Sequence, residues 1–346
     1  MAQNPDHQRK NGRPMKKLIL FVAIILSISC GLSLAQDKWA QTGFQFLSVK
    51  TNARATAMAE AFSTIESTSE ALFYNPAGLA RMNTTYDVSL SQMQWIADIK
   101  YFSITAAFRS WKSQNGVIGF SLQAVDYGDF YFTQVANNEQ GFEDIEGWKG
   151  PSALMFGLAY ARELSDKFAV GGQVKCANQN LGNSIVPVYS KNDTVVVEKY
   201  YGLNVLAFDF GTLYRTGYKS LKFGMSVRNF SQEVRYEKED FQLPLTFHIG
   251  LSMDVLDFFP GVQGRHALLL SFDAAHPRSH PEYVSFGAEY CLMDRLALRT
   301  GYMSNHYETD FSFGIGVKKH GLQVDYSYVP FHVFENINRF TARFSF

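Results

Sequence analysis

The sequence predicts an all-β fold, a transmembrane antiparallel β-barrel of about fourteen strands with a short N-terminal helical plug or hatch. Three observations predict it. Segments of alternating polar and apolar residues follow one another along most of the chain. The connections between these segments are alternately short and long, and the chain ends inside such a segment.

The alternating segments begin near residue 84, and their period of two is that of a β-strand. In residues 246–255, for example, Phe247 and Ile249 alternate with His248 and Gly250. Their length of roughly nine to fifteen residues suits tilted strands that cross a membrane. The expected strands lie near 84–95, 99–109, 116–131, 151–162, 167–181, 201–215, 219–231, 244–256, 265–275, 282–292, 295–304, 309–319, 321–329 and 337–346.

The connections favour a barrel over a secreted β-sandwich, whose strands also alternate. Residues 163–166 and 216–218 form short connections, whereas 132–150, 182–200 and 232–243 form long ones. Short turns at one end and long loops at the other are typical of outer-membrane barrels.

Charged residues of the expected strands fall on the polar face, where a wet lumen would accept them. On the lipid side each would cost about 2–4 kcal/mol near the membrane midplane. These residues are Arg228, Asp254, Glu289, Arg299, Asp325, Arg339 and Arg343.

The chain ends with "NRFTARFSF", in which Phe340, Ala342, Phe344 and Phe346 fall on one side of a strand. A closed barrel pairs its last strand with its first, so the chain can stop in mid-pattern. We therefore expect Phe344 and Phe346 to form the barrel-closing terminus, with Phe346 in the periplasmic aromatic girdle.

The N-terminus predicts a secretory signal peptide over residues 1–35. Two lysines precede the apolar run Leu18–Leu34, which ends in small residues. Lipidation at Cys30 is a less favoured alternative, because "SIS" before it is a poor lead-in. The expected division is then a plug or hatch over 36–83 and an outer-membrane barrel over 84–346.

Composition excludes several classes of protein. The 346-residue chain has 30 Phe and 18 Tyr but a formal net charge of zero. Residues 1–35 contribute +4 of that charge, so the remainder carries −4 and has no basic block for nucleic acid. The three cysteines are too few for a disulfide-stapled scaffold.

Residues 36–83 do not alternate and are rich in Ala, Ser and Thr. Ala53–Phe62 is expected to be a short helix, and the helical run should end at Asn75-Pro76, because a residue before proline avoids the α conformation. The Asn75 side chain should bond nearby backbone while Pro76 fixes φ. A segment this polar cannot span a membrane, so we expect it inside the barrel.

Two stretches of this segment resemble the N-terminal signature of the PorV/PorQ group within the FadL-like outer-membrane proteins. The matching residues of "GFQFLSVKTNARATAMAEAF" and "EALFYNPAGLA" are Gly43, Phe46, Leu47, Ala53, Arg54, Ala55, Met58, Asn75, Pro76, Ala77, Gly78, Leu79 and Ala80. The resemblance marks Arg54, Asn75, Pro76 and Ala77 as the hatch motif. Where relatives usually carry glycines around the methionine, this chain has Ala57, Ala59 and Glu60, which puts the tight backbone contacts of that region in doubt.

The resemblance implies a fourteen-stranded multi-pass barrel in the Gram-negative outer membrane with a hatch inside it. It also implies one of two functions. The preferred one is a non-enzymatic part in type IX protein secretion, with secreted cargo proteins and secretion-system components as partners. The alternative is a FadL-like channel for fatty acids or other hydrophobic small molecules. Outer-membrane lipid surrounds the barrel in both cases, and neither involves nucleic acid.

Catalytic and metal-binding interpretations are weak, and no cofactor is expected. His276 and His280 have a spacing that could hold zinc on a helix, but the prolines beside them favour a loop. The sequence has no nucleophile elbow, P-loop or dinucleotide fingerprint. A serine such as Ser252 or Ser271 could meet His248 or His266 across strands, although lining of the lumen explains such residues better.

Overall fold

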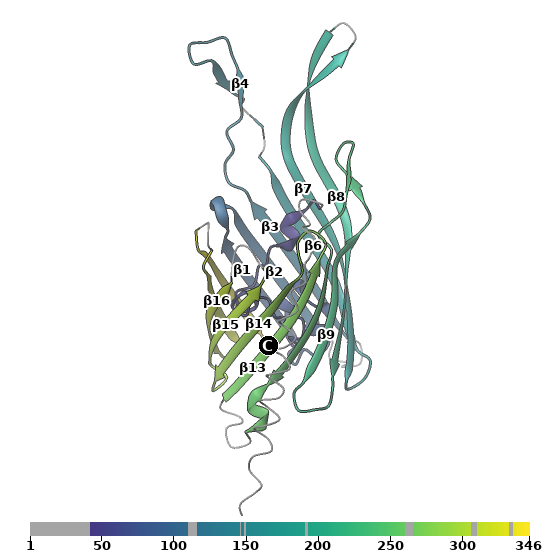
Figure 1. The fold of residues 1–346 in the computed structure, drawn as a ribbon, viewed down its shortest axis with the longest axis vertical. Helices are drawn as coiled ribbons and strands as arrows, with labels where there is room; N and C mark the ends of the chain where they lie inside the picture. The colour runs from purple at the N-terminus through teal and green to yellow at the C-terminus, as the bar shows by residue number, and fades with distance from the viewer. Residues whose placement is uncertain are drawn as a thin grey trace, which may run out of the picture. The chain divides into compact units, whose positions relative to one another are not determined.

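The computed structural model describes residues 42–109, 116–145, 147–148, 150–190, 193–259, 266–305, 310–331 and 335–346. The expected signal peptide of residues 1–35 and Cys30 lie outside the described residues. In the described part of the chain, fourteen antiparallel strands close into one barrel (Figure 1). The predicted fold class is therefore confirmed.

Each of the fourteen expected segments overlaps one strand of the barrel. The barrel strands are β1 (Tyr86–Gln94), β2 (Lys100–Arg109), β3 (Val117–Asp126), β6 (Ser152–Glu163), β7 (Phe168–Ser190), β8 (Asp193–Arg215), β9 (Lys222–Ser231), β12 (Thr246–Asp254), β13 (His266–Pro277), β14 (Tyr283–Leu292), β15 (Leu296–Ser304), β16 (Phe311–Lys319), β17 (Leu322–Val329) and β18 (Ile337–Ser345). Neighbours along the chain pair with each other, and β18 pairs with β1.

The last and first strands close the barrel, with Phe344 opposite Val88. The Phe346 backbone continues this ladder. Its N–H donates to Tyr86 O at 2.9 Å, and its carbonyl oxygen accepts from Tyr86 N at 3.0 Å. A chain that ends in this way leaves no free sheet edge between β18 and β1.

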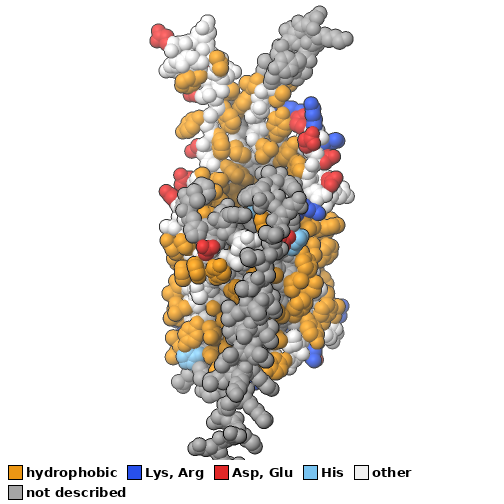
Figure 2. All heavy atoms as spheres, viewed as in Figure 1, with side chains coloured by type: hydrophobic (Ala, Val, Ile, Leu, Met, Phe, Trp, Pro, Cys, Tyr) orange, Lys and Arg blue, Asp and Glu red, His pale blue; other side chains and the backbone are white. Residues whose placement is uncertain are grey.

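The two faces of the wall differ in polarity along every strand. Outward-facing side chains such as Phe120, Phe156 and Phe313 are nearly half exposed, whereas inward-facing Ser121 and Gln123 are buried. Figure 2 shows hydrophobic side chains over much of the barrel wall. An apolar outside around a polar inside is the pattern of a membrane-spanning barrel. Among the described residues no helix has the length and apolarity to cross a membrane.

Connections at one end of the barrel are mostly short, such as 164–167 and 216–221, and the connections 127–151 and 232–245 lie at the other end. We call these the short-turn end and the long-loop end. One expectation about the long loops is wrong. Residues 182–200 are mostly strand, because β7 and β8 continue as a paired hairpin from Asn183↔Tyr200 to Ser190↔Asp193. The stretches "IVPV" and "TVVV" supply β-branched residues that favour strands even beyond the membrane.

Two further small hairpins lie within connections expected to be loops. β4 (Thr133–Val135) pairs with β5 (Phe142–Asp144), and β10 (Val234–Arg235) pairs with β11 (Asp240–Phe241). Figure 1 shows the β4 hairpin and the β7–β8 hairpin projecting far beyond the barrel. Short helical turns connect other strands, namely η4 (Ile96–Asp98) and η6 (Val255–Phe258).

The described residues before β1 carry four short helical elements. They are η1 (Gln45–Ser48), α2 (Ala53–Ala57), η2 (Ser69–Phe73) and η3 (Pro76–Leu79). The helix expected over Ala53–Phe62 begins at Ala53 but ends at Ala57. The left-handed residues Ala59, with φ 49°, and Glu60, with φ 67°, stop it.

A Schellman motif, in which backbone N–H groups beyond the helix bond back to its last carbonyls, ends α2. Glu60 N donates to Ala55 O at 2.8 Å, and Ala59 N donates to Thr56 O at 2.9 Å. Glycine is the usual residue at the left-handed position of this motif. Ala59 and Glu60 therefore adopt a conformation that glycine adopts more readily. These are two of the positions at which the sequence departs from the PorV/PorQ pattern.

Candidate functional site in the barrel lumen

Residues 42–83, here called the lumen segment, pass through the barrel from the long-loop end to the short-turn end. At the long-loop end Gly43 N donates to Gln242 O at 3.1 Å. At the short-turn end Arg81 Nη2 donates to Asp166 O at 2.8 Å. Most of the segment between these points is buried.

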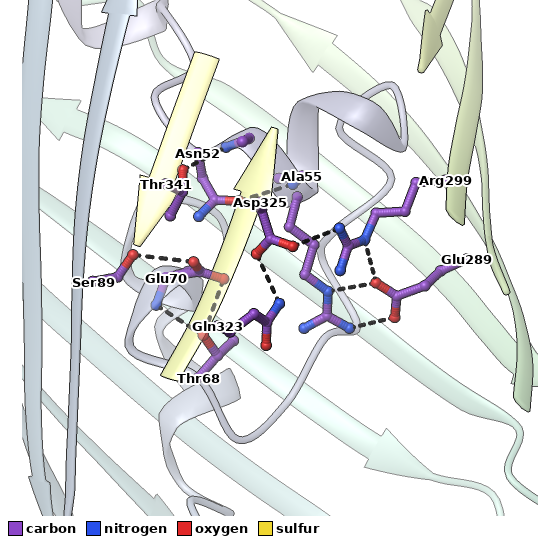
Figure 3. A network of polar contacts seen from close by, with 12 residues as sticks. Asn52, Ala55, Thr68, Glu70, Ser89, Glu289, Arg299, Gln323, Asp325 and Thr341 are labelled. Atoms are coloured by element: carbon purple, nitrogen blue, oxygen red, sulfur yellow. Dashed lines mark hydrogen bonds and ion pairs between the residues drawn. The ribbon is translucent and has the colours of Figure 1, made fainter. Parts of the chain in front are cut away.

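Arg54 joins the lumen segment to the wall through charged hydrogen bonds to Glu289, which Figure 3 labels together with Arg299 and Asp325. Its Nε donates to Glu289 Oε2 at 2.8 Å, and its Nη2 donates to Glu289 Oε1 at 2.6 Å. Arg299 bonds the same carboxylate and reaches Asp325 Oδ1 at 2.7 Å. Two arginines and two carboxylates thus alternate from α2 across β14, β15 and β17, and their charges balance.

The wall residues that the sequence placed on the polar face lie where expected. Glu289, Arg299 and Asp325 are less than one-tenth exposed and face the lumen segment. Buried ions need such partners, since an unpaired charge away from water is costly. This network explains why strands that face lipid on one side carry charges on the other.

The Asn75-Pro76-Ala77 turn is fixed by side-chain hydrogen bonds. Asn75 Oδ1 accepts from Ala77 N at 3.1 Å, and its Nδ2 donates to Ser63 O at 2.7 Å and Thr212 O at 3.1 Å. Pro76 is the first residue of η3, where a missing N–H costs nothing. One side chain therefore caps η3, ties two parts of the lumen segment together and attaches both to β8.

Glycines in the wall let the backbone of the lumen segment approach closely. A Cβ atom at Gly171 would lie 2.5 Å from the Pro76 carbonyl carbon, and one at Gly211 would overlap the Asn75 amide. On the other side of the barrel, a Cβ at Gly287 would lie 2.8 Å from Met58. The sequence offered no indication of these contacts, because glycines in single strands look alike.

Backbone groups of the lumen segment also bond to polar side chains of the wall. Asp273 Oδ2 accepts from the backbone N–H groups of Phe62 and Ser63 at 3.0 and 2.9 Å. Thr341 Oγ1 accepts from Ala53 N at 2.9 Å. The segment has few regular helical bonds, so these wall residues satisfy donors that would otherwise be buried without partners.

A cluster at the short-turn end holds Glu66, whose side chain is 6% exposed, against the barrel rim. Arg215 and Lys222 contact its Oε2 at 2.8 and 3.2 Å. Burial opposes ionisation of this carboxyl, but the hydrogen bond from Arg215 and the charge of Lys222 outweigh it and lower the pKa of Glu66 below its ordinary value. The carboxylate therefore stays ionised and holds the segment where it leaves the lumen.

Two cavities flank α2. The first, of about 370 Å³, lies at the long-loop end and is lined by Thr56, Ala59 and Glu60 of the lumen segment. The second, of about 520 Å³, lies at the short-turn end and is lined by Arg54. The two cavities share no lining residue, so α2 and its ion pairs stand between them.

The residues weighed for catalysis or metal binding do not come together as a site. Ser252 and Ser271 face each other across β12 and β13, but no histidine bonds to either hydroxyl in the described structure. His266 contacts Tyr290 Oη at 2.6 Å. Among the described residues no group of three His, Cys, Asp or Glu side chains could hold a metal ion.

The two histidines with zinc-like spacing have other partners. His276 lies 2.8 Å from Glu282, and His280 Nδ1 lies 2.8 Å from Ser279 Oγ. His276 is well exposed on β13, at the edge of the connection to β14.

The terminal residues Phe344 and Phe346 lie on the outer face of the wall, and the Phe346 side chain is 68% exposed. Its backbone bonds place it at the short-turn end beside Tyr86. Sequence reasoning missed the Glu66 cluster and the long-loop cavity, because the residues that form them are distant in sequence.

Comparison with known proteins adds a family and a fold. No curated protein sequence matches the chain closely enough to count as a relative. The Ralstonia pickettii toluene transporter TbuX has a similar structure, with a TM-score of 0.56 and 12% identity over 85% of this chain and 98% of that one. The CymD monoaromatic hydrocarbon channel is similar with a TM-score of 0.57 and 12% identity over 86% of this chain and 98% of that one. A Pseudomonas aeruginosa FadL homologue is similar with a TM-score of 0.52 and 11% identity over 90% of this chain and 100% of that one.

These identities are low, so the likeness shows the fold alone. It agrees with the barrel fold that the resemblance seen in the sequence implied. The family described as "Type IX secretion system membrane protein PorP/SprF" matches residues 134–330, which is more than half of the chain. The match names PorP/SprF rather than PorV/PorQ, whose signature residues lie before the matched region. With its barrel crossing the outer membrane many times, the chain belongs to the PorP/SprF family of type IX secretion system membrane proteins.

Proposed function

We propose that this barrel is a non-enzymatic docking protein of type IX secretion that receives protein partners on the hairpins projecting from its long-loop end. This role is the one implied by the resemblance of its lumen segment to the signature of the PorV/PorQ group. The partners are exported cargo proteins or other secretion-system components. Outer-membrane barrels have short periplasmic turns and longer outer loops, so the projecting hairpins face the cell exterior.

Apolar side chains held in water at the long-loop end carry this proposal. Tyr131 is 89% exposed, Val135 is 94% exposed and Phe142 is 48% exposed, on or beside the β4–β5 hairpin. Figure 2 places charged side chains around the projecting hairpins as well. Aromatic residues anchor protein interfaces, and scattered charges at a rim set specificity.

The base of the β4–β5 hairpin is ordered by aromatic packing. Phe132 packs edge-on against Trp148 with ring centroids 5.5 Å apart, and it stacks on Phe130 at 6.5 Å. Packed rings at the base present the tip residues in a fixed arrangement. A preorganised surface binds a partner with less loss of conformational entropy than a flexible loop does.

The lumen supports docking better than conduction. A charge-balanced ion network and the body of α2 separate the two cavities. The structural likeness to a toluene transporter and a hydrocarbon channel favours the alternative of a channel for hydrophobic solutes. That alternative requires an apolar path past α2, whereas the groups beside α2 are arginines and carboxylates.

Capture of partners by purified barrels tests the proposal. The double variant Tyr131→Ser with Phe142→Ser, expressed in the native host and purified in mild detergent, should lose its co-purifying secretion proteins. Tyr218→Ser is the matched control, because Tyr218 is 59% exposed at the opposite end of the barrel. Equal capture by both variants, or lipid as the only bound material, would contradict the docking role.

A further inference from the structure

The cavity of about 370 Å³ at the long-loop end contains two arginines that the network of Figure 3 does not use. Arg228 projects from β9 and Arg339 from β18, and both line this cavity. They are 5% and 3% exposed. Buried guanidinium groups normally have a carboxylate partner, so their surroundings are informative.

Arg228 has no anionic partner among the described residues. Its guanidinium makes no hydrogen bond or ion pair with them, and its Nε is fully buried without an acceptor. The guanidinium lies over the ring of Tyr74, whose centroid is 5.9 Å from Cζ. Attraction to an aromatic face offsets only part of the cost of burying a cation.

Arg339 is only partly satisfied. Its Nε donates to the backbone oxygen of Lys50 at 3.2 Å, while its Nη1 is buried without a partner. The guanidinium lies over the ring of Trp95, with 5.7 Å between Cζ and the centroid. The Trp95 ring therefore reports on whatever approaches this arginine.

Tyr74 does not line the cavity but lies directly beside Arg228, whose Cζ is over its ring. Its hydroxyl is buried and has no hydrogen-bond partner in the described structure. Tyr74 therefore supplies no negative charge to the neighbouring guanidinium.

The other charged groups of the cavity do not supply the missing anion. Glu60 pairs with Lys50 at 2.6 Å, and its charge also acts on Arg339, but it forms no ion pair with Arg228 or Arg339 in the described structure. Asp310 also lines the cavity, where it has interactions of its own. The two acidic side chains would repel a dianion more strongly than a monoanion.

We propose that this cavity is a binding site for a carboxylate carried on an apolar body, held by Arg228 and Arg339. Arginine binds carboxylates through paired N–H donors, and two buried guanidinium groups with N–H donors that lack acceptors are the arrangement that such a ligand would complete. Apolar side chains that line the cavity are available for the body of the ligand. They include Leu47, Val49, Trp95, Met303 and Phe331.

The ligand enters from the outer side of the barrel. Pro281, Asn305 and Asp310, in the connections at the long-loop end, line the cavity. The carboxylate belongs either to a small organic acid or to the C-terminus of a peptide chain, and both present the same group. This site is independent of docking at the hairpins, since it shares no residue with them.

Tryptophan fluorescence measures the binding, and because the chain has four tryptophans the Trp95 signal is the difference between wild type and Trp95→Phe. Wild-type protein in a non-ionic detergent is titrated with phenylacetate and, as a neutral match, with phenylacetamide. A short apolar peptide with a free C-terminus and the same peptide with a C-terminal amide form the second pair. We expect the acid of at least one pair to bind at least tenfold more tightly than its amide, and the pair that discriminates identifies the source of the carboxylate.

Variants assign the binding to the arginines. Arg228→Gln and Arg339→Gln should each weaken binding at least tenfold, while Arg235→Gln, which changes an exposed arginine on β10, should not. Arg228→Met should fold and should be at least as heat-stable as wild type without ligand, because it removes an unpaired buried charge. Equal binding of acid and amide, tighter binding of inorganic phosphate, binding unaffected by both glutamine variants, or a marked loss of heat stability in Arg228→Met would each overturn the proposal.

Discussion

Arg54 of the lumen segment and Glu289 of the barrel wall form a two-bond ion pair, with 2.8 Å between Nε and Oε2 and 2.6 Å between Nη2 and Oε1. Their side chains are 15% and 8% exposed. Arg299 and Asp325 extend the pair into a network without net charge. The attachment of the segment to the wall therefore depends on keeping the charges balanced.

Removing one charge from this network should loosen the lumen segment. Arg54→Met leaves two buried carboxylates, Glu289 and Asp325, with Arg299 as their one cation, and should weaken the attachment by about 3 kcal/mol. Arg54→Met combined with Glu289→Gln restores the charge balance, so its cost should be smaller than the sum of the single changes. The rate at which a protease cleaves within residues 42–83 of the folded barrel measures both effects.

Lys318→Gln is the control, because it removes a salt bridge between two exposed side chains. Lys318 pairs with Asp294 at 2.9 Å, but the two side chains are 42% and 78% exposed. Such a pair contributes at most about 1 kcal/mol. Strict additivity of the Arg54 and Glu289 changes would refute the idea of a coupled network.

The Asn75-Pro76 turn should anchor the lumen segment without supporting the barrel. Asn75→Ala with Pro76→Ala removes three side-chain hydrogen bonds and the fixed φ of proline. Each bond contributes roughly 1 kcal/mol, so protease should cleave residues 42–83 much faster in this variant. The barrel itself should still show heat-modifiable migration on a gel.

Asn138→Ala is the matched control for this turn. Asn138 makes similar side-chain bonds to Gly141 N at 2.7 Å and Phe142 O at 2.8 Å, but in an exposed hairpin. Its loss should leave cleavage of the lumen segment unchanged. Unaltered proteolysis in the Asn75→Ala, Pro76→Ala variant would show that the turn does not hold the segment.

Adjacent wall glycines should respond differently to a methyl group. Gly171→Ala places a Cβ 2.5 Å from the Pro76 carbonyl carbon and should destabilise the segment by about 1–3 kcal/mol. Gly172→Ala places a Cβ no nearer than 3.7 Å to any neighbour and should be close to neutral. Protease cleavage and the heat-modifiable gel shift distinguish them. Similar behaviour of the two variants would mean that close packing at Pro76 is unimportant.

The terminal backbone, rather than the exposed ring of Phe346, should close the folded barrel. Deleting Phe344–Phe346 removes the bonds to Tyr86 and part of the β1–β18 ladder, so folded protein in the membrane should fall several-fold. Phe346→Ala keeps those backbone bonds and tests the side chain alone. Normal yield from the deletion would show that the terminus is dispensable for closure.

Local periodicity was sufficient to predict the barrel. Alternation identified the strand positions and the lumen-facing charges, because in a barrel wall a residue's neighbours in sequence decide its side of the sheet. The lumen segment was harder to predict. Its α2 helix ends early because Ala59 and Glu60 adopt left-handed conformations, which the helix-forming letters of "ARATAMAEAF" do not indicate.

The sites depend on long-range pairing that no local pattern encodes. Arg54 meets Glu289, which is 235 residues away, and Arg228 shares a cavity with Arg339. The sequence marked all four residues, but it could not tell paired arginines from unpaired ones. The β7–β8 extension was missed for another reason. The expected strand length was that of a membrane crossing, but β-branched residues beyond that length continue both strands.

A photo-crosslinking amino acid placed in living cells tests the docking role most directly. It replaces Tyr131 on the outer hairpin or, as the comparison, Phe120 on the lipid-facing wall, where the side chain is 45% exposed. We expect Tyr131 to crosslink to a protein exported by type IX secretion or to a component of that system, and Phe120 not to do so. Protein adducts of the same kind at both positions, or none at Tyr131 while secretion proceeds normally, would contradict the docking role.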